Sequence, residues 1–260
     1  MANQVDLKDV TFLIPIRLDS IYRIENLLMA IERLTAQFKT HIHILEADEY
    51  NNGLLTRLLP DTVIHAFVRD FDPIFHRTKY INQMVKHCST PLLAVWDSDV
   101  IVPHEQMLEA VRWLREGEAD FVRPYDNQFL DTTMIIRELY FNTRDILTLQ
   151  KHQGKMTPLY PPYPVGGGFF ANTKKYKESG LENERFYGWG IEDGERVNRW
   201  NILGYQYKNT SGTMYHLSHP RGKNSQFHCP QESDVKNAEL YRIASMSKEQ
   251  LSDEISNWNH

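Results

Sequence analysis

The alternation of short apolar runs with amphipathic segments constrains the fold of this chain more than any other feature. Residues 21–38 and 78–88 repeat apolar side chains at three- and four-residue steps, which indicates one buried face of a helix. Strand-like apolar runs stand before, between and after them, at 11–15, 41–47, 62–68 and 92–96. Such strand–helix alternation predicts an α/β fold, a three-layer sandwich whose mostly parallel central sheet has helices on both faces.

Local signals set the expected element boundaries. Pro15 closes the first apolar run, so the first strand is expected to end there. Asp19 or Ser20 is expected to cap the helix that follows. Further along, residues 132–150 have a helical pattern, and residues 157–168 form a loop rich in proline, tyrosine and glycine.

Length, charge and cysteine count exclude several classes of protein. The 260 residues are enough for a sizeable core, and the net charge of −5 argues against a nucleic-acid partner. Two cysteines, Cys88 and Cys229, are too few for a disulfide framework and favour a reducing compartment. The first ten residues are polar, and no run approaches the ~20 apolar residues of a membrane span. We therefore expect a cytoplasmic protein, and a peripheral membrane contact stays open.

The first candidate site is Asp97-Ser98-Asp99, directly after the apolar run 92–96. Ligands of open α/β sheets bind beyond the carboxyl ends of the strands, and these acids lie at such an end. Two carboxylates one residue apart can share Mg²⁺ or Mn²⁺ with a diphosphate, because both ions prefer oxygen ligands. The alternative is a solvated turn or a helix cap.

The second candidate site is the stretch Tyr187-Gly188-Trp189-Gly190-Ile191-Glu192-Asp193, which opens a helix that should stop at Gly204. An ionised Asp193 could accept a proton from an attacking hydroxyl group. Trp189 offers a flat apolar face to a sugar ring. The alternative is that both acids only cap the helix.

Histidines and basic residues complete the set. His216 and His219 are three residues apart and could supply further metal ligands. Arg17 after the first strand, and Arg77 and Lys79 before the third helix, could neutralise a diphosphate. Asp48, after the second strand, could accept a hydrogen bond from a uracil or a ribose.

These pieces, in this order, resemble the GT-A fold glycosyltransferases that use nucleotide sugars. The first half is similar to the inverting family-two transferases, in Leu13-Ile14-Pro15-Ile16-Arg17, Glu46-Ala47-Asp48 and Asp97-Ser98-Asp99. The second half resembles β-1,4-galactosyltransferases and chondroitin-polymerase-type transferases, in the stretches 166–170, 186–193 and 214–219. The resemblance implies one GT-A domain over residues 1–230, with a nucleotide-binding half at about 10–120, an acceptor and catalytic half at about 121–230, and a polar helical tail at 231–260.

The resemblance also implies roles for single residues. Asp193 is the expected catalytic base, and Glu192 holds a hydroxyl group of the donor or acceptor. Asp99 and one or both of His216 and His219 bind Mn²⁺, or Mg²⁺, that bridges the phosphates of UDP. The donor is expected to contact Pro15, Arg17, Asp48, Arg77, Lys79, Asp97, Ser98, Gly167, Gly168 and Trp189.

The implied activity is transfer of a hexose or N-acetylhexosamine from a UDP-sugar to a saccharide hydroxyl with inversion, in surface polysaccharide synthesis. The first alternative is a binding protein for nucleotide sugars or carbohydrates that has no turnover. A nucleotidyltransferase usually has a glycine-rich loop after the first strand, and residues 15–19 contain no glycine. A zinc hydrolase built on His216, His219, His228 and Cys229 leaves the acids at 97–99 and the stretch 187–193 without a role.

Overall fold

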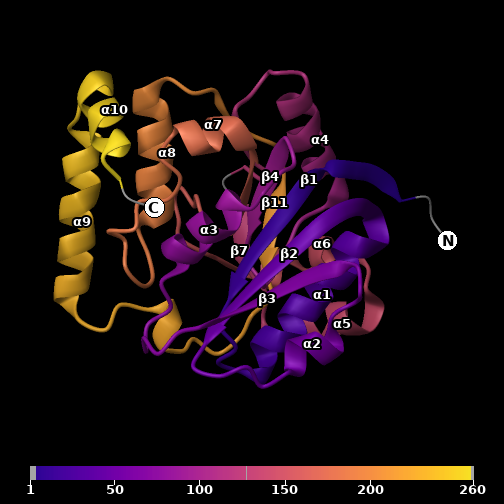
Figure 1. The fold of residues 1–260 in the computed structure, drawn as a ribbon. Helices are drawn as coiled ribbons and strands as arrows, with labels where there is room; N and C mark the ends of the chain where they lie inside the picture. The colour runs from indigo at the N-terminus through magenta and orange to yellow at the C-terminus, as the bar shows by residue number, and fades with distance from the viewer. Residues whose placement is uncertain (1–3, 127, 259–260) are drawn as a thin grey trace.

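The computed structural model describes residues 4–126 and 128–258, and its centre is a seven-stranded sheet (Figure 1). The strand order is β10-β6-β9-β4-β1-β2-β3, and β9 runs antiparallel to both of its neighbours while the other pairs are parallel. The strands are β1 (Val5–Ile16), β2 (Phe38–Asp48), β3 (Val63–Arg69), β4 (Leu92–Trp96), β6 (Phe121–Arg123), β9 (Gly168–Asn172) and β10 (Tyr207–Asn209). The predicted α/β fold with a mostly parallel sheet is confirmed.

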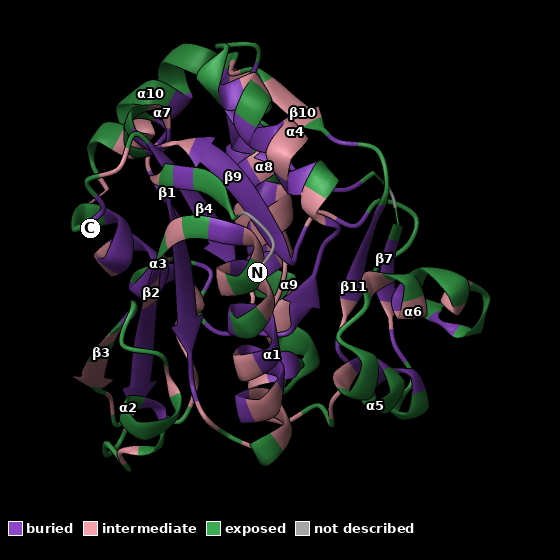
Figure 2. Ribbon diagram, turned by 90° about the vertical axis from the view of Figure 1, so that its right-hand side faces the viewer, coloured by how far each residue is buried: buried purple, intermediate pink, exposed green. Residues whose placement is uncertain are grey.

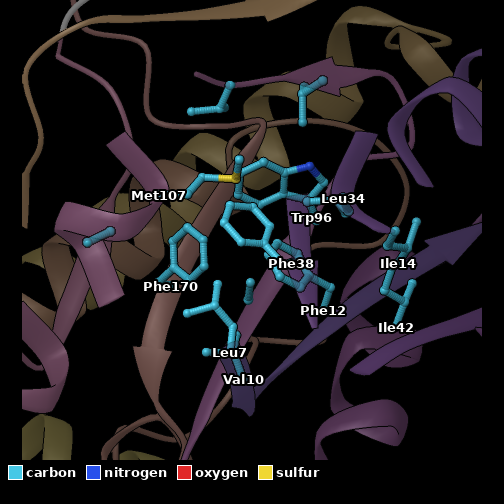
Figure 3. Close-up of a cluster of buried hydrophobic side chains, with 14 of the residues drawn as sticks. Leu7, Val10, Phe12, Ile14, Leu34, Phe38, Ile42, Trp96, Met107 and Phe170 are labelled. Carbon is cyan, nitrogen blue, oxygen red and sulfur yellow. The ribbon is translucent and has the colours of Figure 1, made fainter. Parts of the chain in front are cut away.

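Helices cover both faces of this sheet and give the predicted three layers. One face packs against α1 (Ile21–Gln37) and α4 (His104–Arg115), and the other against α3 (Arg77–Lys86), α7 (Thr173–Glu178) and α8 (Glu192–Leu203). The strands β4 and β9 are purple over their buried lengths in Figure 2. Around Phe12, Trp96 and Phe170 the rings meet edge to face, with centroids 5.5–5.6 Å apart (Figure 3). Ring pairs of this geometry add to the free energy gained by burying apolar area.

A smaller four-stranded sheet stands beside the first, in the order β5-β11-β7-β8. Its strands are β5 (Val100–Ile101), β7 (Gln128–Asp131), β8 (Thr157–Pro158) and β11 (Thr213–His216). The remaining helices are α2 (Leu54–Leu58), α5 (Met134–Thr143), α6 (Ile146–Lys151), α9 (Pro230–Ala244), α10 (Lys248–Ser256) and the 3-10 turns η1 (Gln153–Lys155) and η2 (Lys223–Ser225). Within the described residues, no helix is long and apolar enough to cross a bilayer.

The first strand and the helix expected at 132–150 differ from the prediction. The first strand already begins at Val5, before the expected run 11–15. The first strand runs through Pro15 to Ile16, because the pairing of β1 with β4 stops at Leu13 and the last residues pair with β2. The expected single helix at 132–150 is two helices. Arg144 ends α5 in a left-handed conformation, with φ 57°, and the side chain of Asp145 caps α6. The Ser20 cap of α1 is confirmed by its bond from the Arg23 amide.

Candidate active site

A cavity of about 470 Å³ lies beyond the carboxyl ends of β1 and β4. In the strand order, β2 and β3 follow β1 on one side while β4 lies on the other, so the chain changes direction between β1 and β4. Open α/β sheets bind their ligands at this kind of switch point. Most of the predicted site residues line the cavity: Pro15, Arg17, Arg77, Asp97, Ser98, Asp99, Gly167, Trp189, Glu192, Asp193, His216 and His219.

Asp99, His216 and His219 form the candidate metal centre, with one possible ligand atom of each within 4.8 Å of the others. The Nε2 atoms of His219 and His216 lie 3.2 and 3.7 Å from Asp99 Oδ2. Strand β11 carries His216, and the Leu217 amide donates to the Asp99 carbonyl at 2.7 Å, which fixes the two segments side by side.

The Nδ1 atoms of both imidazoles contact oxygen atoms of the protein, and both Nε2 atoms are turned toward Asp99 Oδ2. His216 Nδ1 lies 2.7 Å from Asp131 Oδ1, and His219 Nδ1 lies 2.9 Å from the Pro220 carbonyl. In metal-binding histidines the ring nitrogen that does not bind the metal usually donates to a carboxylate or a carbonyl. This hydrogen bond orients the ring and fixes its tautomer. One carboxylate and two oriented imidazoles fit a divalent metal that accepts both oxygen and nitrogen ligands.

Asp99 and the imidazole of His216 shift each other's pKa. Burial raises the pKa of Asp99, but the neighbouring imidazoles outweigh it and hold the pKa well below its usual range. Burial lowers the pKa of His216, but Asp99 and Asp131 together raise it to about 9. His216 therefore holds a proton that a bound cation must displace.

Arg77 connects the first acid of the Asp97-Ser98-Asp99 segment to the helix α8. Its Nη2 lies 2.6 Å from Asp97 Oδ1, and its Nη1 lies 3.9 Å from Glu192 Oε1. Burial first, and then the charge of Asp193, raises the pKa of Glu192 to about 7. Glu192 Oε2 is buried and has no hydrogen-bond partner among the described residues, so this carboxyl group can receive a bond from a ligand.

Asp193 is held from two sides by groups that we did not predict. Arg196, one helical turn later, forms an ion pair with Asp193 Oδ1 and binds both oxygens of Glu182 at 2.8 and 2.7 Å. On the other side the backbone of Gly166 leaves the room that Asp193 needs, because a Cβ on Gly166 would lie 2.7 Å from Asp193 Oδ2. The helical spacing of 193 and 196 is the sequence signal for the first contact.

Arg17 lines the cavity, but its donors are already used by the protein. Its Nε donates to the Ala47 carbonyl at 2.8 Å, and its Nη1 to the Asp72 carbonyl at 2.7 Å. Its Nη2 pairs with Asp70 at 2.6 Å. Arg23 also lines the cavity. Its Nε and Nη2 donate to Asp19 and Ser225, and its Nη1 lies 3.6 Å from Asp99 Oδ2, beside the candidate metal centre.

Aromatic rings form the wall near Trp189. Its ring centroid lies 5.2 Å from that of Phe227 and 6.2 Å from that of Tyr160. The Arg221 guanidinium stands 6.0 Å from the Trp189 ring centroid, in a cation–π arrangement. Tyr160 belongs to the loop 157–168 that the sequence marks as rich in proline, tyrosine and glycine, and Arg221 follows the predicted His219 by two residues. Neither was assigned a role, and Phe227 was not predicted.

Three predicted donor-binding residues do not line the cavity. Asp48 ends β2, one strand away from the switch point, and its carboxylate accepts from the neighbouring Glu49 amide. Lys79 is exposed on α3. Gly168 is the first residue of β9 inside the sheet, where a Cβ would lie 2.8 Å from the Trp96 ring. The hydrolase set is also dispersed, because His228 and Cys229 are exposed and lie outside the metal cluster.

No protein-family model matches this chain. No curated protein matches its sequence. Solved structures do match over most of its length. The catalytic domain of Drosophila β1,4-galactosyltransferase 7, solved with xylobiose, has a TM-score of 0.52 at 18% identity and covers 90% of this chain and 79% of its own. Glucosyl-3-phosphoglycerate synthase from Mycobacterium tuberculosis, solved with Mn²⁺, UDP and phosphoglyceric acid, has a TM-score of 0.52 at 14% identity and covers 91% of this chain and 78% of its own. The chain thus has the GT-A fold of the nucleotide-sugar glycosyltransferases.

Proposed function

We propose that this chain is a metal-dependent glycosyltransferase that moves a hexose or N-acetylhexosamine from a UDP-sugar to a saccharide hydroxyl with inversion. One observation carries the proposal: the Asp99, His216 and His219 cluster and the acids Glu192 and Asp193 line the same cavity. The segments 97–99, 192–193 and 216–219 are far apart in the sequence. Helix caps and turns at each segment would not require all three to line one cavity. The resemblance in sequence and the shared fold support the same activity.

The metal centre is proposed to hold Mn²⁺ or Mg²⁺. A structure of the Drosophila enzyme is a complex with manganese, UDP-Gal and xylobiose. When bound, such an ion neutralises charge on the departing UDP oxygen. Asp99, His216 and His219 supply its protein ligands, and Asp131 holds the His216 ring in place. Arg23 lies at the same end of the cavity and can contact the diphosphate.

Asp193 is proposed as the catalytic base. Its Oδ1 forms an ion pair with Arg196, which fixes the position of the carboxylate, and Asp193 itself lines the cavity. The proton of the acceptor hydroxyl passes to this carboxylate as the acceptor oxygen bonds to the anomeric carbon. The bond from that carbon to the UDP oxygen breaks at the same time, and UDP leaves with the electron pair. Glu192 is proposed to hold a sugar hydroxyl through its unpartnered Oε2.

Release of UDP from UDP-sugars, with saccharide acceptors and Mn²⁺, tests the proposal. Asp193→Asn should slow turnover by about 10²–10⁴-fold, the usual contribution of a general base, with UDP affinity retained. Asp99→Ala should weaken Mn²⁺-dependent UDP binding in calorimetry. Asp48→Asn is the matched control, because this acid also ends a strand but does not line the cavity.

The outcomes separate the two functional classes. Binding of UDP-sugar and Mn²⁺ without UDP release, for every acceptor, would favour the alternative of a binding protein without turnover. Normal turnover in Asp193→Asn would remove the assigned base. The absence of any Mn²⁺-dependent UDP binding would reject both the enzyme and the binding protein.

A further inference from the structure

Helix α9 (Pro230–Ala244), the last but one in the described chain, reaches the candidate active site, although its sequence is polar. It lies beside α8, and Ile243 from α9 packs in one apolar cluster with Leu203 and Leu251 (Figure 1). Asn237 and Leu240, one turn apart on α9, line the cavity. The helix therefore forms part of the cavity wall.

Lys236 is a buried cation on this helix that the proposed mechanism does not use. The residue is 5% exposed, and its Nζ donates to the Trp189 carbonyl at 2.5 Å. The same ammonium lies 5.2 Å from the centroid of the Phe227 ring, which packs against Trp189. Burial lowers the pKa of Lys236, while Glu192 and Glu232 oppose that change. Burying a lysine is costly, so a specific contact must offset the cost.

The segment that Lys236 contacts has an unusual backbone. Gly188, Gly190 and Ile191 all have positive φ angles, of 75°, 97° and 75°. A positive φ is rare for a β-branched residue such as Ile191, and strain of this kind persists only where the surroundings fix the conformation. Phe227 closes against Gly190, and Ile74 closes against Gly188, where added Cβ atoms would lie 3.1 and 3.0 Å from these side chains. The bond from Lys236 fixes the carbonyl between the two glycines.

Lys236 itself is not among the residues that line the cavity, whereas Trp189, Gly190 and Phe227 are. Direct contact of its ammonium with a substrate is thus not indicated. Its hydrogen bond holds the Trp189 carbonyl, while Trp189 lines the cavity with the rings of Phe227 and Tyr160 beside its own.

We propose that Lys236 is a positioning residue that holds the 188–191 segment, and through it the Trp189 ring, as the saccharide-binding wall of the site. The inference rests on the proposed glycosyltransferase function. Trp189 stands four residues before Asp193, the proposed base for the acceptor hydroxyl, and both line the cavity. The inference therefore assigns the Trp189 ring to the acceptor, and not to the donor as the resemblance implied. It also assigns part of acceptor binding to a helix that the sequence marks as a polar tail.

The test replaces Lys236 by Met, which keeps the length of the side chain and removes the donor. Lys236→Met should raise the acceptor KM about tenfold, the effect of losing one charged hydrogen bond, while the KM for UDP-sugar stays unchanged. Lys236→Arg should restore most of the acceptor affinity, because it supplies a donor again. Val235→Ala, at a residue 66% exposed on the same helix, is the control for general effects on α9. An unchanged acceptor KM in Lys236→Met, or equal increases for both substrates, would overturn the proposal.

A second measurement needs no turnover. The fluorescence of Trp189 is obtained by subtracting the spectrum of Trp189→Phe. Acrylamide should quench this fluorescence more strongly in Lys236→Met than in the wild type, and equally in Val235→Ala and the wild type. Unchanged quenching would also overturn the positioning role. If the wild-type chain releases no UDP but the quenching changes as expected, the proposed activity fails while the positioning of Trp189 stands.

Discussion

Glu192→Gln should stabilise the protein at neutral and alkaline pH and have little effect near pH 4.5. The pKa of Glu192 is raised from 4.5 to about 7 in the folded chain, chiefly by burial and then by Asp193. Between these values the unfolded chain has released the proton that the folded chain retains. Raising the pH across this window therefore favours the unfolded state and lowers the free energy of unfolding. Glutamine does not ionise, so the free energy of unfolding of the variant does not fall over this pH range.

The size of the effect follows from the same pKa values. Their difference corresponds to on the order of 3 kcal/mol, at about 1.4 kcal/mol for each pKa unit. The side chain is 6% exposed, so solvent screening removes little of it. For a chain of this length the change corresponds to a shift in Tm of roughly 8 °C. Urea unfolding of both proteins from pH 4.5 to 8, with a chelator present, measures it.

The control is Glu49→Gln, which changes an exposed glutamate. Its unfolding curve should follow the wild type at every pH. A constant difference between Glu192→Gln and the wild type over the whole range would refute the reasoning, because it would mean that the folded state does not retain the Glu192 proton. Turnover should fall in the same variant, since a site that is costly to fold is retained for its chemistry.

Two further predictions concern groups that hold the reacting residues. Gly166→Ala places a Cβ 2.7 Å from Asp193 Oδ2, so the carboxylate must move. We expect kcat to fall by about 10²-fold, as for other small misplacements, with UDP binding retained in calorimetry; an unchanged kcat would contradict the assigned geometry. Asp131→Ala removes the partner of His216 Nδ1 and should weaken Mn²⁺ affinity by about 10–100-fold in a metal titration. Equal affinity would show that His216 needs no such support.

The four strands of the first hundred residues and the place of the cavity were predictable because they depend on local patterns. The strands β6, β9 and β10 of the same sheet were not expected. The run Leu92–Trp96 is apolar at every position, as expected for a strand buried on both faces, and it was assigned with its true bounds. Acids that directly follow such a strand lie at the edge of the sheet where the carboxyl ends of the strands meet. That rule brings Asp97 and Asp99 to the cavity.

The same rule failed for Asp48 because it carries no information on strand order. Asp48 also follows a buried strand, but β2 lies one position away from the point where the chain changes direction. Strand order depends on contacts between distant segments, which local periodicity does not encode. For the same reason the sequence did not reveal Lys236, whose partner Trp189 is 47 residues away.

The resemblance assigns the base to Asp193 and hydroxyl binding to Glu192, but the sequence gives no physical reason for that division, because the two acids are neighbours in the first turn of one helix. The structure gives them different surroundings. Asp193 forms an ion pair with Arg196, whose second partner Glu182 fixes the guanidinium. Glu192 has a more distant cation, Arg77 at 3.9 Å, and one oxygen without a partner among the described residues. Adjacent acids in unlike environments can divide proton acceptance from hydroxyl binding, so the difference in their partners is the physical basis for assigning the base to Asp193.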